Sequence, residues 1–230
     1  MGAAASGLRG VAALKGGEGE EENGVHLPTF DHRLTDSPTY RLTDSFMRGI
    51  PRIMTDLQSS IPAGAHIGHV HLKVADLDRA VDFYRRGLGF ELMTRFGNQA
   101  AFLSAGGYHH HIGLNTWESQ GGAPPPPGST GLYHFAINYP ERRDLAVALM
   151  RLLDNGWGID GASDHGTHEA IYLHDPDGNG IELAWDRDPS SWRRGGEIIF
   201  ERKALDWASL MAELDDTAPA EVLAGLARYT

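Results

Sequence analysis

The sequence contains no cysteine, relatively few positive charges and no long hydrophobic run. The absence of cysteine excludes a disulfide scaffold, a thiol nucleophile, a cysteine-ligated zinc and an iron–sulfur cluster. The 20 Lys and Arg residues are outnumbered by 31 Asp and Glu residues, which gives a formal net charge of −11. Because so acidic a chain repels phosphates and anionic headgroups, we expect neither nucleic acid nor a membrane surface as a partner.

The sequence also has no pattern of a membrane span or of a signal peptide. No apolar run approaches the ~20 residues that cross a bilayer, and residues 1–17 lack the charged-then-apolar pattern of a signal peptide. We therefore expect a cytoplasmic protein. Apolar residues make up 41% of the chain, which is enough for a packed core in one or two domains.

Histidine is the residue that stands out among those present. The chain has 12 histidines, and most of them lie between His66 and His174. Since the chain has no thiolate to offer, any metal that it binds must be held by histidine and carboxylate ligands.

Composition divides the chain into three parts. Residues 1–62 begin with an Ala/Gly-rich stretch and an acidic, Gly-rich stretch, which predict an extension without a core of its own. Its first six residues fit an N-myristoylation pattern, although a flexible leader of small residues is the favoured interpretation. A folded domain is expected over residues 63–190. Two helical patterns in residues 191–230 predict a C-terminal helical tail that covers the domain or a neighbouring subunit.

The domain reads as two copies of one module, strand–helix–strand–strand–strand, over residues 65–118 and 131–187. Residues 121–128 between them include four consecutive prolines, which predict a stiff linker. The fold class is therefore α+β, with two paired βαβββ modules that form a curled mixed sheet around a cleft. The alternation of apolar residues predicts strands over residues 66–74, 90–96, 100–104, 109–116, 132–138, 158–163, 169–174 and 180–185.

A histidine opens the first strand of each module, at His69 and His134. Alternate residues of a strand share a face, so His69 and His71 point the same way, and only the match to His134 favours His69. Glu182 alternates with apolar neighbours on the last strand. Each of these residues alone is more often a hydrogen-bonded or solvated side chain than a ligand. Their matched placement predicts a metal held by His69, His134 and Glu182, a set that suits non-haem Fe(II).

Three segments carry a family resemblance: residues 69–77 (HVHLKVADL), 82–84 (DFY) and 175–183 (DPDGNGIEL). They resemble the vicinal oxygen chelate superfamily, which includes glyoxalase I, bleomycin-resistance proteins and extradiol ring-cleaving dioxygenases. The resemblance extends over about residues 65–190. The turn that leads into Glu182 is its most specific part, because Pro176, Gly178 and Gly180 punctuate it.

The resemblance assigns the metal ligands. His69, His134 and Glu182 match the positions at which extradiol dioxygenases hold Fe(II), with Mn(II) as the alternative metal. Glyoxalase I has a fourth ligand, a carboxylate on the last strand of its first module, and the matching residue here is Gly113. Three ligands leave room for a catecholate and O₂ at the metal.

The resemblance also implies catalytic residues. Tyr172 matches a tyrosine that hydrogen-bonds a substrate oxygen. His110 matches the histidine that acts as acid and base, with His109 and His111 as alternatives. His165 matches a histidine near the substrate, and His168 competes for that role.

The function expected from this match is a metal-dependent extradiol dioxygenase, an oxidoreductase that uses O₂ to open catechol-type rings in the breakdown of aromatic compounds. The alternatives are a glyoxalase-like isomerase or lyase and a non-catalytic binding protein of the bleomycin-resistance kind. The familiar extradiol enzymes have four modules, whereas this chain has two. Members with a single pair of modules often form dimers, so a homodimer is expected.

Overall fold

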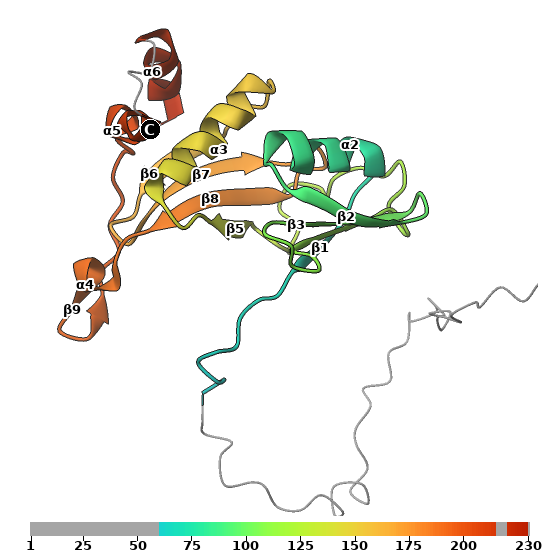
Figure 1. Ribbon diagram of the computed structural model, residues 1–230, viewed down its shortest axis with the longest axis horizontal. Coiled ribbons are helices and arrows are strands. Elements are labelled where there is room, and N and C mark those ends of the chain that lie inside the picture. The colour runs from blue at the N-terminus through green and yellow to red at the C-terminus, as the bar shows by residue number, and fades with distance from the viewer. Residues whose placement is uncertain (1–59, 215–219, 230) are drawn as a thin grey trace, which may run out of the picture. The chain divides into compact units, whose positions relative to one another are not determined.

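The computed structural model describes residues 60–214 and 220–229 (Figure 1). The extension expected over residues 1–62, with its myristoylation pattern, lies outside these ranges except for its last three residues. The two modules and the tail belong to a single unit, Pro62–Thr230.

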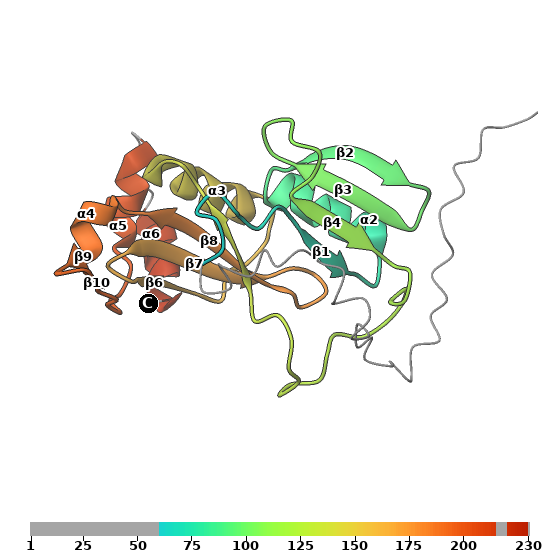
Figure 2. The same ribbon diagram turned by 90° about the horizontal axis from the view of Figure 1, so that it is seen from below.

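Each module contributes a four-stranded mixed sheet, and neither sheet is closed (Figure 2). In both sheets the first and last strands of the module are parallel neighbours, and the other pairs are antiparallel. The predicted α+β class and the two βαβββ modules are confirmed. The first sheet has the order β1 (Val70–Lys73), β4 (Ile112–Asn115), β3 (Ala100–Ser104) and β2 (Glu91–Phe96). The second has the order β5 (Phe135–Asn138), β8 (Gly180–Asp186), β7 (His168–His174) and β6 (Gly161–Asp164).

Strand register makes the two modules directly comparable. In the first sheet, Gly113 of β4 lies between His71 of β1 and Phe102 of β3. The corresponding row of the second sheet consists of Ala136, Glu182 and Tyr172. Gly113 and Glu182 are therefore equivalent positions on the last strands of the two modules.

One helix covers a face of each sheet (Figure 1). In the first module, α2 (Leu77–Asp82) starts at Asp76, whose carboxylate accepts a hydrogen bond from Arg79 N, and continues as the π-helical turn η1 (Phe83–Gly87). Gly89 then leaves the helix with a φ of 85°. In the second module, α3 (Arg142–Asp154) presents the apolar stripe Leu145, Ala148, Leu149 and Leu152 to its sheet.

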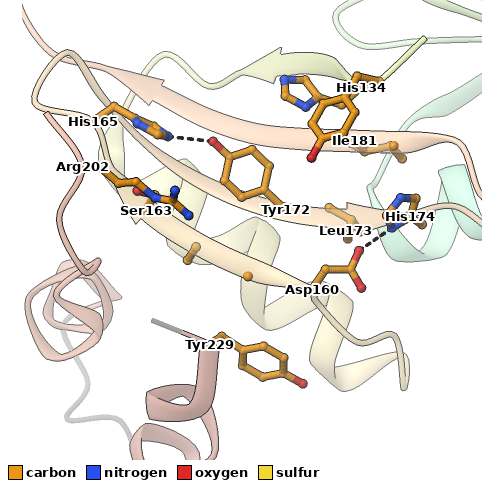
Figure 3. Close-up of a pocket in the computed structure, with 14 residues that line it drawn as sticks. His134, Asp160, Ser163, His165, Tyr172, Leu173, His174, Ile181, Arg202 and Tyr229 are labelled. Atoms are coloured by element: carbon orange, nitrogen blue, oxygen red, sulfur yellow. Dashed lines mark hydrogen bonds and ion pairs between the residues drawn. The ribbon is translucent and has the colours of Figure 1, made fainter. Parts of the chain in front are cut away.

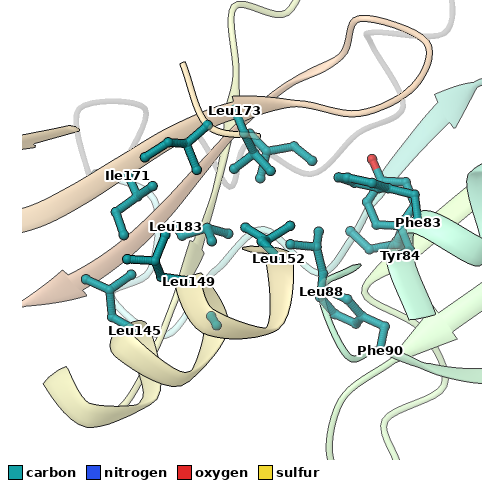
Figure 4. Close-up of a cluster of buried hydrophobic side chains, with 14 of the residues drawn as sticks. Phe83, Tyr84, Leu88, Phe90, Leu145, Leu149, Leu152, Ile171, Leu173 and Leu183 are labelled. Atoms are coloured by element: carbon teal, nitrogen blue, oxygen red, sulfur yellow. The ribbon is translucent and has the colours of Figure 1, made fainter. Parts of the chain in front are cut away.

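A single hydrophobic core joins the two modules (Figure 4). The π-helical turn buries both Phe83 and Tyr84, although they are adjacent in sequence. The Phe83 ring packs edge-on against Trp157 of the second module, with ring centroids 4.8 Å apart. The helices that cover the sheets thus also fix the modules to one another.

The strands that were expected to start with histidine begin later. His69 and His134 precede β1 and β5, and the triplet at residues 109–111 lies in the connection before β4. Gly106 and Gly107, with φ of 67° and 77°, turn the chain there, so the triplet does not enter the regular ladder. These histidines are therefore at strand entrances, where their side chains are less constrained by strand alternation.

The tail is only partly helical. It starts with α4 (Pro189–Trp192) and a hairpin of β9 (Arg193–Arg194) and β10 (Glu197–Ile198). The rest is α5 (Trp207–Met211), η2 (Ala212–Leu214), α6 (Ala220–Leu226) and η3 (Ala227–Tyr229). Trp207 and Leu210 are buried in the common core. Within the two described ranges, no helix has both the length and the hydropathy of a membrane span.

Candidate active site

Glu182 of β8 is a buried carboxylate with a histidine at each oxygen. It is only 7% exposed. The Nε2 atom of His134 lies 2.8 Å from Oε2, and the Nε2 atom of His168 lies 3.0 Å from Oε1. Imidazole nitrogen and carboxylate oxygen are the donor types expected for a metal site, and the structure brings two of the three predicted ligands, His134 and Glu182, into contact.

Small residues on β8 and on the neighbouring β7 allow these contacts. A Cβ atom at Gly180 would collide with the carbonyl oxygen of Tyr133, so the chain before β5 can approach β8 only because position 180 is glycine. On the other side, Ala170 and Ala184 face each other between His168 and Glu182 in the β7–β8 ladder. Their short side chains leave space for the longer side chains of His168 and Glu182 to meet.

Tyr172 lies beside this group, directly across from Glu182 in the β7–β8 register. Its hydroxyl is 2.8 Å from Nε2 of His165 (Figure 3). The Nδ1 atom of His165 lies 3.3 Å from the carbonyl oxygen of Glu201, which can only accept a hydrogen bond. In the neutral ring Nδ1 therefore carries the proton, and Nε2 accepts from the Tyr172 hydroxyl.

The environment of Tyr172 keeps this hydroxyl protonated. Burial, reinforced by the negative charge of Glu182, raises the pKa of Tyr172 to about 12. At neutral pH the residue is thus a hydrogen-bond donor on the same face of the sheet as Glu182. Its ring also lies near His134, with ring centroids 5.7 Å apart.

A cavity of about 630 Å³ opens over the second sheet (Figure 3). His134, His165 and Tyr172 line it, together with two residues of the tail, Arg202 and Tyr229. Sequence reasoning missed both tail residues, because no pattern in residues 191–230 indicates where the tail returns to the sheet. This volume is in the range of small-molecule sites.

The remaining predicted residues form a second cluster at the entrance of the first sheet. The rings of His69 and His110 have centroids 4.4 Å apart, and Nδ1 of His110 is 2.8 Å from Nδ1 of His109. Burial, followed by the charges of His69 and His109, lowers the pKa of His110. His110 is therefore a neutral base at pH 7.

In the first module His71 occupies the space over Gly113. A Cβ atom at Gly113 would lie 2.9 Å from Cγ of His71, closer than real contacts allow. Burial and the nearby His69 lower the pKa of His71. Where the second module has a carboxylate, the first thus has a glycine covered by an imidazole ring.

The two clusters are separate in the structure. Among residues 60–214 and 220–229, no hydrogen bond, ion pair or ring contact joins His69 or His110 to Glu182 or His134. No set of three His, Asp or Glu in these ranges has the arrangement of a metal site. His134 and His168 reach different oxygens of Glu182.

The turn over residues 175–179 fixes the start of the strand that carries Glu182. Asp175 accepts hydrogen bonds from the backbone of Asp177 and Asn179 and from the hydroxyl of Tyr84 in the first module. Asp177 accepts from Arg79 Nη2 at 2.6 Å, also in the first module. The position of Glu182 therefore depends on contacts between the modules.

Comparison with known proteins identifies the family. Residues 66–183, 118 of the 230, match the model of the Glyoxalase/Bleomycin resistance protein/Dioxygenase superfamily. The chain belongs to this superfamily, in agreement with the resemblance seen in the sequence.

Two curated relatives are named as dioxygenases. Catechol-2,3-dioxygenase of Bacillus subtilis (strain 168) is 38% identical over 161 residues, which are 69% of this chain and 55% of the relative. Biphenyl-2,3-diol 1,2-dioxygenase 3 of Rhodococcus globerulus is 31% identical over 123 residues, 52% of this chain and 63% of the relative. The chain thus spans less than two thirds of the length of either relative. A solved structure, lactoylglutathione lyase from Agrobacterium tumefaciens, aligns with a TM-score of 0.43 and 21% identity over 54% of this chain and 96% of that chain.

Proposed function

We propose that the chain is a metal-dependent extradiol dioxygenase that opens catechol-type aromatic rings with O₂. The observation that carries this proposal is the contact of His134 with Glu182 on the face that also holds the Tyr172–His165 pair. The dioxygenase names of the two curated relatives support it.

The metal in this proposal is Fe(II), with Mn(II) as the alternative, held by His69, His134 and Glu182. Of this donor set the structure brings His134 and Glu182 together, and the buried carboxylate, which faces imidazole nitrogens, needs a positive partner. The first module supplies the third ligand, His69, and His168 competes with it because it already contacts Glu182. When bound, such a metal acidifies the catechol hydroxyls and activates O₂.

Tyr172 and His165 act together in the proposed reaction. With its pKa at about 12, the Tyr172 hydroxyl keeps its proton and donates a hydrogen bond to an oxygen of the bound catechol. His165 holds the hydroxyl in position through Nε2 while no substrate is bound. The contact of His165 with the Glu201 carbonyl fixes the tautomer that this requires.

His110 is the proposed acid and base. Its lowered pKa makes it neutral at pH 7, so it can accept a proton from a catechol hydroxyl and return it to an oxygen of the opening ring. The reaction breaks the carbon–carbon bond beside the two hydroxyls and places both atoms of O₂ in the product. It consumes one catechol and one O₂ and needs no external reductant.

The test is an assay of the full chain after anaerobic loading with Fe(II) or Mn(II). We expect catechol to be consumed with one equivalent of O₂ and with the absorbance of a ring-opened product. Turnover of a glutathione hemithioacetal with inert catechols would instead establish a glyoxalase-like isomerase. Failure to bind a stoichiometric divalent metal would indicate a binding protein. Sedimentation of the same sample tests whether the chain forms the homodimer expected from the sequence.

A further inference from the structure

Arg202 lines the cavity, yet the proposed reaction does not use it. It lies in the segment that follows β10 and returns to the edge of the second sheet. Lys203 exchanges two backbone hydrogen bonds with Asp164 of β6, at 2.9 and 2.8 Å, and Glu201 N donates to the carbonyl of His165 at 2.8 Å. This short antiparallel pairing fixes which face each residue of the segment takes.

The register places Arg202 on the cavity face. In the β6–β7 ladder, Gly161 is paired with Tyr172 on the cavity face, whereas Ala162 is paired with the core residue Ile171. Side chains alternate along a strand, so Asp164 and its partner Lys203 face away from the cavity. Arg202, one residue earlier, faces into it, as Figure 3 shows.

The positive charge of Arg202 has no ion-pair partner among the described residues. Its neighbours Glu201 and Lys203 form an ion pair with each other on the other face. Arg202 itself forms no ion pair or hydrogen bond with any residue in the described ranges. Of the described residues that line the cavity, it alone is a lysine or arginine, while Asp160 is already paired with His174 at 2.5 Å.

The position of Arg202 relative to Tyr172 and Glu182 suits a substituted ring. Glu182, Tyr172 and the Arg202 segment lie on β8, on β7 and beyond β6, in that order across the sheet. With strands ~4.8 Å apart, the backbones of β8 and this segment are at most about 14 Å apart. His134, which precedes β5, and Arg202, which follows the strand order beyond β6, thus line the cavity from opposite edges of the sheet.

We propose that Arg202 determines specificity by binding an anionic substituent, a carboxylate or sulfonate, on the ring of the substrate. Guanidinium binds such groups with two parallel hydrogen bonds in a fixed plane. The diol end of the ring then faces His134 and Glu182, and the anionic end faces Arg202. This inference rests on the proposed function for the diol end, whereas the anion site itself depends only on the cavity and on Arg202.

The first experiment measures binding without turnover. The full chain is titrated calorimetrically with benzoate, with benzenesulfonate and with the neutral analogue benzamide. We expect the two anions to bind and benzamide to bind at least about 10-fold more weakly, since a hydrogen bond to a charged group is lost. Arg202→Gln should remove the preference, and Lys203→Met, which deletes the neighbouring charge on the other face, should keep it. Equal binding of benzoate and benzamide to the unmodified chain would overturn the proposal.

The second experiment compares two substrates of the Fe(II)-loaded chain, 3,4-dihydroxybenzoate and catechol. Arg202→Gln should raise KM for the charged substrate by about 10- to 100-fold, and Arg202→Lys by less, with catechol changed less than about twofold. An equal loss with both substrates would contradict the assignment. If neither ring is cleaved but the benzoate preference is lost in Arg202→Gln, the anion site stands and the dioxygenase proposal fails. If catechol is cleaved and no variant alters selectivity, the dioxygenase proposal stands and the anion site fails.

Discussion

The two modules share a topology but differ in what they place on equivalent positions. The central row of the second sheet carries Glu182, buried between two histidines, beside a protonated Tyr172. The equivalent position in the first sheet is Gly113, covered by the ring of His71. The comparison teaches that one backbone pattern can be used twice while the chemistry is concentrated in one copy, because strand register fixes positions and not side chains.

The histidines at the strand entrances are the feature that both modules keep. His69 and His134 occupy matching places, but only His134 contacts a carboxylate. His69 instead packs against His110. If the proposed metal joins the modules, His69 is the residue that must change partners, and the following variants test how far the two halves differ.

The largest effect is expected for Glu182→Ala. Loss of this carboxylate should reduce metal affinity by at least about 100-fold, because outer-shell partners alone are worth about 10–100-fold. Metal content after dialysis, measured by atomic emission, checks this. Glu197→Ala removes an exposed acid on β10 and serves as the matched control. Retention of a full equivalent of metal by Glu182→Ala would remove Glu182 from the site.

A smaller effect, on rate alone, is expected for His110→Ala. The variant should keep its metal while kcat for ring opening falls by about 10²- to 10⁴-fold, the usual contribution of a general acid–base group. Metal content and kcat are measured on the same sample, with His66→Ala as the control for removal of an exposed histidine. Equal metal loss in His110→Ala and Glu182→Ala would show that His110 is a ligand and not an acid–base group.

The smallest effect is expected for Gly113→Ala. It adds a side chain in the first module at the position equivalent to Glu182 in the second. The new Cβ would lie 2.9 Å from the His71 ring, so the free energy of unfolding should fall by about 1–3 kcal/mol through overpacking. Urea unfolding measures this. When the His71 ring is already removed, adding Gly113→Ala should cost much less: the free energy of unfolding of His71→Ala/Gly113→Ala should be close to that of His71→Ala. If it does not, the two residues are not in steric contact.

Much of the fold is predictable from the sequence because it depends on local patterns. The apolar stripe of α3 and the alternation in β7 and β8 are visible in short windows, and all eight strands of the two modules are found near their predicted positions. The strand starts at His69 and His134 were misplaced, since the ladder begins only where both neighbouring backbones are in register. Short windows of sequence do not contain that information.

The candidate site was predictable only in part. The contact of His134 with Glu182 follows from the duplicated pattern and the resemblance. The contact of His168 with Glu182 depends on two alanines that face each other across strands, and Arg202 depends on a tail that pairs with a strand about 40 residues earlier. Such long-range pairings are set by the tertiary structure, so no local pattern indicates them.

The turn before β8 has a consequence for how the protein can evolve. Tyr84 and Arg79 of the first module hold the turn that precedes β8 of the second module. Selection on one module therefore also acts on the other. A change on the helix of the first repeat is transmitted to the acid of the second. Each half therefore depends on the other for the geometry of the strand that carries Glu182.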